Sequence, residues 1–155
     1  ITFCKTDNPS QRVTDMLQNE RDIGLDQLEY FNGFARRVQA LRTEIRGRLG
    51  KMKASGARIA AYGAAAKGTI MLNYLGVDSK TIEYAVDRNT MKQGRYIPGV
   101  RIPIKGPEIL ESDPPDVLII LPWNFRDEIV RQQQGFIQGG GHILVPIPKM
   151  EIIAA

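Results

Sequence analysis

The sequence predicts an α/β domain of the Rossmann-like type, in which a parallel sheet with flanking helices follows a long N-terminal amphipathic helix. From residue 57 on, short apolar runs alternate with helical segments, an order that favours parallel strands joined by right-handed crossovers. The first of these runs ends in a loop of small residues bounded by Gly63 and Gly68. With 155 residues, of which 43% are hydrophobic, the chain can bury one such core.

Residues 1–22 are predicted to be a connector, and residues 23–155 the Rossmann-like domain. Ile1–Lys5 alternates like a short strand and begins without a methionine or a lead-in, so we expect the chain to be a piece of a longer protein. Ser10 is the expected N-cap of a short helix that follows.

A long amphipathic helix is predicted after residue 25, because apolar residues recur in steps of three and four from Leu25 to Met52. Eight basic residues against one acid lie between Arg36 and Arg58, which would also suit a nucleic-acid surface. Their angular positions favour solvated residues that flank the apolar face. One side is expected to carry Arg42, Arg46 and Lys53, and the other Arg48 and Lys51.

The later elements follow from apolar runs separated by turn residues. Buried strands are predicted at 57–62, 83–86, 117–121 and 142–145, with an edge strand around 100–104. Helical segments are predicted at 65–74, 107–110 and 124–137.

The composition limits the classes of binding partner and the cellular compartment that can be expected. A formal net charge of +4 favours phosphate-bearing small molecules over tight nucleic-acid binding. Cys4 is the single cysteine, which excludes an internal disulfide and a cysteine-rich zinc site and favours a reducing compartment, most simply the cytoplasm. No apolar stretch approaches the roughly 18 residues of a membrane span, so no membrane is expected.

The glycine-bounded loop is predicted to hold a phosphate group. Gly63 ends the first strand and Gly68 lies in the first turn of the next helix, where backbone N–H groups are unpaired. The loop matches the dinucleotide fingerprint with Ala65 in place of its second glycine, and Lys67 precedes Gly68, unlike a P-loop. The predicted substrate-binding residues of the loop are Gly63, Ala64, Ala65, Ala66, Lys67 and Gly68. The alternative is that both glycines only permit close packing of helix on strand.

Two further positions complete the predicted binding set. Asp87 closes the second strand, where dinucleotide folds place the acid that binds a ribose diol, although it could instead cap the turn that begins at Arg88. Trp123 and Asn124 follow another buried strand. The indole could stack on a base and the amide could hydrogen-bond it, or the tryptophan could plug the top of the sheet.

Other polar residues are assigned structural roles. His142, the single histidine, lies at the start of a strand and therefore at the sheet end opposite the expected cleft. Asp113 and Asp116 flank two prolines at that same end, which indicates solvated turn residues. No catalytic, cofactor-binding or metal-binding residue is predicted on this chain.

These residues resemble the C-terminal domain of the S-adenosylmethionine-dependent C-methyltransferases that act on nucleotide-linked deoxysugars. The likeness spans most of the chain and rests on the motifs at 56–68, 86–89, 92–96, 121–124 and 139–148. It implies a Rossmann-like domain packed against a methyltransferase domain, with a nucleotide sugar between them. S-adenosylmethionine, the catalytic base and a zinc module would belong to the missing part, so this chain would bind the nucleotide sugar without transferring the methyl group.

Two other functions stay open at this point. The chain could be a stand-alone nucleotide- or NAD-binding module, although the side chain of Ala65 disfavours a tightly held pyrophosphate of the NAD kind. It could also be a pure interaction domain, whose long helix serves as a contact surface.

Overall fold

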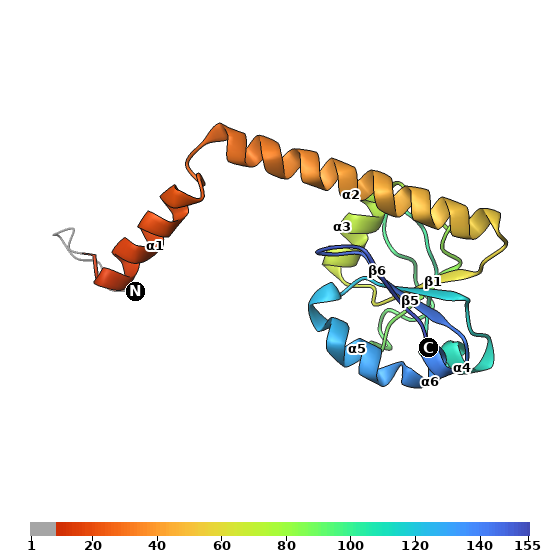
Figure 1. Ribbon diagram of the computed structural model, residues 1–155. Helices are drawn as coiled ribbons and strands as arrows, with labels where there is room; N and C mark the ends of the chain where they lie inside the picture. The colour runs from red at the N-terminus through yellow and green to blue at the C-terminus, as the bar shows by residue number, and fades with distance from the viewer. Residues whose placement is uncertain (1–8) are drawn as a thin grey trace. The chain divides into compact units, whose positions relative to one another are not determined.

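The computed structural model describes residues 9–155 (Figure 1). The chain divides into two compact units, residues 1–40 and 41–155, and each is described by itself. The strand expected at Ile1–Lys5 lies outside the described residues. The division between connector and domain expected after residue 22 stays a prediction.

The first unit contains α1 (Gln11–Asp22) and the beginning of α2 (Leu28–Ala54). Ser10 is the N-cap of α1 in an extended conformation, as predicted, although its side chain makes no capping hydrogen bond. The predicted long helix begins at Leu28 because the preceding residues form a turn, in which Gly24 has a φ of 74° and its carbonyl accepts from the Gln27 N–H. α1 has no buried residue.

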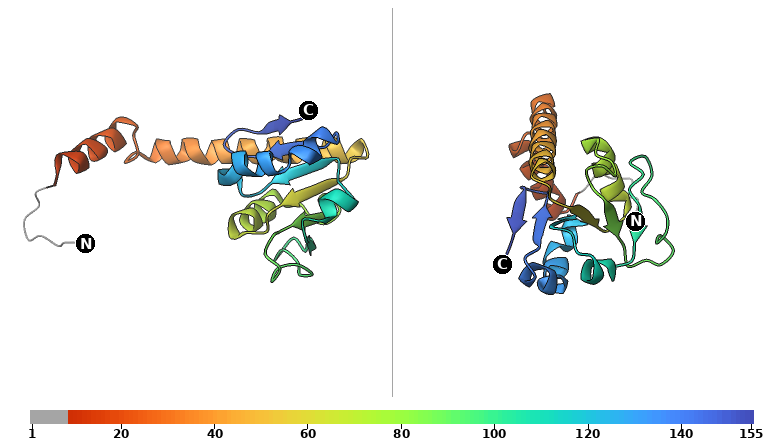
Figure 2. Two further views of the ribbon diagram at one scale, coloured as in Figure 1. Left: turned by 90° about the horizontal axis from the view of Figure 1, so that it is seen from below. Right: turned by 90° about the vertical axis from the view of Figure 1, so that its right-hand side faces the viewer.

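The second unit is built on a six-stranded sheet of order β3-β2-β1-β4-β5-β6 (Figure 2). The strands are β1 (Ile59–Tyr62), β2 (Tyr84–Val86), β3 (Ile104–Lys105), β4 (Val117–Ile120), β5 (His142–Val145) and β6 (Glu151–Ile153). Neighbours from β3 to β5 pair in parallel, and β6 pairs with β5 in antiparallel register. The α/β fold and its four buried strands are therefore confirmed.

Helices cover both faces of the sheet (Figure 2). The side chains of the strands alternate between the two faces and divide the core in two. Besides the later part of α2, the helices are α3 (Ala66–Leu75), α4 (Ile109–Ser112), the 3-10 turn η1 (Trp123–Phe125), α5 (Arg126–Gln132) and α6 (Gln134–Gln138). Ala61 of β1 faces the core that Leu49 of α2 and Leu72 of α3 fill. Ala60 faces the core that Ile129 of α5 and Ile137 of α6 fill. Because consecutive strand residues point to opposite faces, a run buried on both sides reads as continuously apolar.

Three details differ from the sequence-based expectation. The edge strand is shorter than predicted, because Arg101 has a φ of 54° and its N–H bonds the Ile97 carbonyl, which turns the chain before Ile104. The single helix expected at 124–137 is divided into η1, α5 and α6. The antiparallel strand β6 was not predicted.

The basic residues of α2 do more than flank its apolar face. Arg42 donates to the Tyr74 carbonyl at 2.7 Å, and Arg46 donates to the carbonyls of Leu75 and Gly76. These acceptors end α3, where the last carbonyls of a helix lack partners within it. The expectation of purely solvated arginines was therefore incomplete, because this pair ties α2 to the C-terminus of α3.

Candidate functional site

The carboxyl ends of β1 and β4 form the switch point of the sheet. These two parallel strands are neighbours, but β1 leads into α3 on one face and β4 leads through η1 into α5 on the other. Their connections therefore diverge at the position where doubly wound folds bind ligands. Every predicted binding residue follows β1, β2 or β4 at this edge.

Both glycines of the loop are required by packing. Gly63 has a φ of 87°, and a Cβ there would lie 2.8 Å from Cδ of Pro122. A Cβ on the buried Gly68 would lie 2.8 Å from Cβ of Leu121, which brings the first turn of α3 against the end of β4. Gly68 thus performs the helix-on-strand packing of the third fingerprint glycine. This structural role and the predicted phosphate-binding role are compatible.

The N-terminus of α3 is open to a ligand. Ala65 is its N-cap in an extended conformation, and no side chain caps the first turn. Ala65, Ala66 and Lys67 are exposed. Small side chains leave the backbone N–H groups of this turn accessible, and the helix dipole gives them a partial positive charge.

Lys67 joins the loop to the residues that follow β4. Its Nζ donates to Oδ1 of Asn124 at 2.9 Å and lies 5.6 Å from the ring centroid of Trp123. The half-buried Trp123 also packs against both hydrophobic cores, so it closes the top of the sheet as the structural alternative proposed. Three of the residues predicted from separate segments are therefore brought together. A hollow of about 370 Å³ borders Trp123 and Asn124, and residues 123–128 and Arg131 line it.

Asp87 lies beside the Gly63–Gly68 loop, and its carboxylate points toward the backbone of that loop. Its Oδ2 accepts from the Ala64 N–H at 2.8 Å and from Lys92 Nζ at 2.9 Å, and its Oδ1 accepts from the Asn89 N–H at 2.9 Å. Burial alone would raise its pKa, but these hydrogen bonds outweigh burial and hold the pKa below the ordinary carboxyl value. The turn-capping alternative is thus present in the structure, and the ribose contact stays a prediction.

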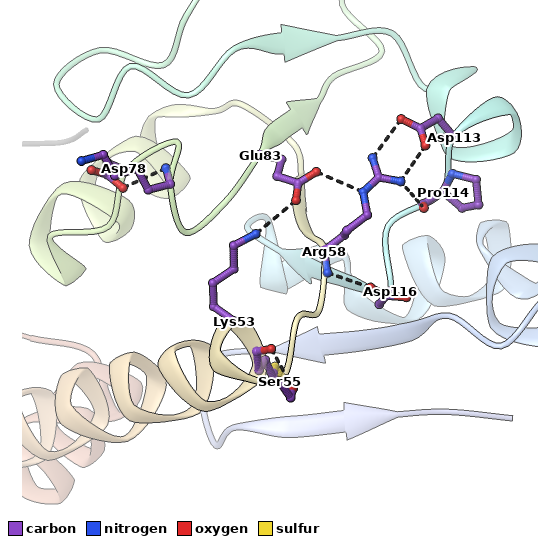
Figure 3. Close-up of polar contacts among 10 residues, drawn as sticks. Lys53, Ser55, Arg58, Asp78, Glu83, Asp113, Pro114 and Asp116 are labelled. Carbon is purple, nitrogen blue, oxygen red and sulfur yellow. Dashed lines mark hydrogen bonds and ion pairs between the residues drawn. The ribbon is translucent and has the colours of Figure 1, made fainter.

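The opposite, amino end of the sheet carries an ion-pair network (Figure 3). The Arg58 guanidinium donates to both carboxylate oxygens of Asp113, at 2.6 and 2.9 Å, and to Glu83 at 3.2 Å. Glu83 also accepts from Lys53, and Asp116 accepts from the Arg58 N–H. The hydrogen bonds that Arg58 donates to Asp113 and Glu83 raise the pKa of Arg58, and the same interaction lowers the pKa of Asp113. Asp113 and Asp116 are therefore structural, but they are engaged with Arg58 and are not simply solvated turn residues.

A cavity of about 800 Å³ also lies at the amino end, between the segments that precede β4 and β5. Glu108, Glu111 and Asp116 line it together with prolines, glycines and Phe136. No Lys or Arg of the described residues lines this cavity, whereas Asp127 and Glu128 of the 370 Å³ hollow are accompanied by Arg126 and Arg131. Carboxylates without a neighbouring cation repel a diphosphate, so this cavity does not suit the anionic ligand expected from the sequence. His142 is exposed at the start of β5, at this same end, as predicted.

Among residues 9–155, no group of three or more His, Cys, Asp or Glu side chains could hold a metal ion. Within the same range, no helix is long and apolar enough to cross a membrane.

Comparison with known proteins identifies the family. A family model described as "C-methyltransferase C-terminal domain" matches residues 2–148. The chain belongs to this C-methyltransferase family. It is also similar to the C-methyltransferase NovU of Streptomyces niveus, with 36% identity over 143 residues. The match covers 92% of this chain and 34% of NovU, so this C-methyltransferase domain spans about a third of the length of that relative.

Proposed function

We propose that this chain is the nucleotide-sugar-binding domain of an S-adenosylmethionine-dependent C-methyltransferase that acts on a nucleotide-linked deoxysugar. The proposal is supported by the meeting of Lys67 with Trp123 and Asn124 beside the uncapped start of α3. A cation, an aromatic face, an amide and free backbone donors are the groups that bind a diphosphate and its attached rings. They converge at the switch point, where this class of sheet binds ligands.

In this proposal the diphosphate binds at the first turn of α3, over Ala65 and Ala66. Lys67 exchanges the amide oxygen of Asn124 for a phosphate oxygen, which gives a charge-assisted hydrogen bond. The released Asn124 amide and the indole of Trp123 then contact a ring of the ligand.

Methyl transfer is assigned to a preceding methyltransferase domain, which would bind S-adenosylmethionine. The first unit supports such a contact, because Leu28, Phe31 and Phe34 of α2 are 75%, 52% and 56% exposed. Exposed apolar side chains gathered in one segment are typical of an interaction surface. We also propose a cytoplasmic location, supported by the single cysteine of the sequence.

The test is calorimetry of the chain with UDP-glucose, dTDP-glucose, NAD and S-adenosylmethionine. We expect a nucleotide sugar to bind and S-adenosylmethionine not to bind. Ala65→Val should abolish binding, because a branched side chain would stand where backbone must approach phosphate. Lys67→Ala should weaken binding by about 1–3 kcal/mol, the loss of one charge-assisted contact.

The matched controls are Ala54→Val and Lys51→Ala, which change the same residue types at exposed positions of α2. Both controls should bind as the parent does. The proposal is wrong if Ala65→Val and Lys67→Ala fold normally and bind nucleotide sugars as the parent does. Tight binding of S-adenosylmethionine would contradict the division of labour, and tight binding of NAD would favour a stand-alone dinucleotide module.

A further inference from the structure

The carboxylate of Asp87 connects two loops of the candidate site. One loop runs from Gly63 to Gly68, and Asp87 holds it through the Ala64 N–H. The other follows β2, and Asp87 holds it through the Asn89 N–H and Lys92 Nζ, while Gln93 donates to the Asp87 carbonyl. The side chain of Asp87 is only 12% exposed. Four contacts to one residue therefore fix the two loops against each other.

These contacts leave too little of the carboxylate for a ribose. An ionised carboxylate offers about four lone-pair positions, and three of them are occupied here. A ribose diol bound by both hydroxyls requires two more. If Asp87 bound the diol, it would lose the hydrogen bond from Ala64 or the ion pair with Lys92. The half-buried Ala64 N–H or Lys92 ammonium would then be left without its partner.

Lys92 also changes the charge that a ligand meets. Its ammonium lies 2.9 Å from the Asp87 carboxylate and is itself half-buried. The pair is electrically neutral, so Asp87 does not repel a diphosphate at the neighbouring helix N-terminus. A free carboxylate at this position would oppose the phosphate that the loop is expected to bind.

We infer that Asp87 is a positioning residue, which latches the Gly63–Gly68 loop through Ala64 and is neutralised by Lys92, and that it does not read the ribose 2′-hydroxyl. The second part rests on the proposed function. It follows that the domain accepts ribo- and 2′-deoxyribonucleoside diphosphates alike, whereas NAD-binding domains use the acid at this position to select the diol.

The latch is tested without a ligand, by NMR of the ¹⁵N-labelled chain. The Ala64 amide proton should resonate downfield and should follow the titration of the Asp87 carboxyl at acid pH. Asp87→Asn should remove this titration, and Lys92→Met should move its midpoint to higher pH because the cation that favours the carboxylate is gone. Asp78→Asn is the matched control, since Asp78 also accepts from a turn N–H, that of Lys80. An Ala64 amide that is the same in Asp87→Asn and in the parent overturns the latch.

Ribose recognition is tested by calorimetry with UDP and 2′-deoxy-UDP. We expect the two affinities to agree within about threefold in the parent. Asp87→Asn should weaken the binding of both nucleotides by the same factor. That factor should be smaller than the one expected for losing a direct hydrogen bond between the ligand and a charged group. A preference for UDP of about tenfold or more, equivalent to 1.4 kcal/mol, that disappears in Asp87→Asn would show that Asp87 binds the ribose. If neither nucleotide binds, the proposed function fails, and the Ala64 amide still decides the latch.

Discussion

The two ends of the sheet differ in how their charged groups are paired. At the amino end, Arg58 binds Asp113 and Glu83, so its charge is neutralised within the fold. At the carboxyl end Asp87 and Lys92 are also paired, but Lys67 is held by a neutral amide, and the first turn of α3 has no side-chain cap. Groups that are left weakly paired stabilise the fold little and remain available to a ligand. The difference indicates that the amino end serves stability and the carboxyl end serves binding.

The largest expected effect tests how much the packing of Gly68 at the carboxyl end contributes to stability. Gly68→Ala should destabilise the chain by about 1–3 kcal/mol, because the new Cβ would lie 2.8 Å from Cβ of Leu121. Gly50→Ala is the control, since nothing lies within 4 Å of a Cβ there and alanine should stabilise α2 by about 0.5–1 kcal/mol. Urea unfolding measures the free energy of unfolding of both variants and the parent. If Gly68→Ala were as stable as the parent, α3 would not depend on this close approach to β4.

A smaller effect is expected at Tyr84, which links the core to the amino-end network. The side chain is buried, and its hydroxyl donates to the Asp113 carbonyl at 3.0 Å. Tyr84→Phe should cost about 0.5–1.5 kcal/mol near neutral pH. Thermal unfolding of the variant and the parent measures this difference.

Tyr84 also predicts an alkaline dependence. Burial raises its pKa from 10.0 to about 12. Because the folded-state pKa is raised, the stabilisation is fully present below pH 10.0 and is lost as the pH rises toward 12. The stability advantage of the parent over Tyr84→Phe should therefore shrink in this window. A constant advantage up to pH 12 would contradict the burial of this hydroxyl.

The smallest effect is expected from Asp113→Asn, because its ion pair with Arg58 is exposed to solvent. Arg58 lowers the pKa of Asp113 below 3.8, so the pair contributes fully above pH 3.8 and is lost as the pH falls through the folded-state pKa. The variant should melt slightly below the parent at pH 7, and the gap should close in acid. Asp26→Asn, an exposed position in the first unit, should show no such gap. A gap for Asp113→Asn that persists in acid would exclude the ion pair as its cause.

The strands were predictable because they are buried on both faces, which makes runs such as Val117–Ile120 continuously apolar. Strand β6 was missed because it pairs on one side only and is partly exposed, so its sequence carries a weaker signal. The turn at Arg101 was also missed, since a non-glycine residue with positive φ has no clear sequence mark.

The sequence predicted at which edge of the sheet the site residues lie, but not all of the contacts that they make. Glycine spacing and the ends of apolar runs placed Lys67, Trp123 and Asn124 at one edge, and the structure brings them into contact. The sequence offered turn capping as the alternative role of Asp87, but its contacts with Ala64 and Lys92 could not be predicted, because these residues approach it only in the folded chain. The signal available in the sequence was the lysine five residues after the acid, within a turn rich in polar residues.

The central claim, that the carboxyl end binds the nucleotide sugar and the amino end does not, is tested most directly by NMR. The ¹⁵N-labelled chain is titrated with UDP-glucose and dTDP-glucose, and amide shifts are followed at both ends of the sheet. We predict that the amides of residues 64–69 and 123–125 move with either ligand, whereas those of residue 116 and residues 139–141, which line the 800 Å³ cavity, do not. Shifts confined to the cavity residues would contradict the account.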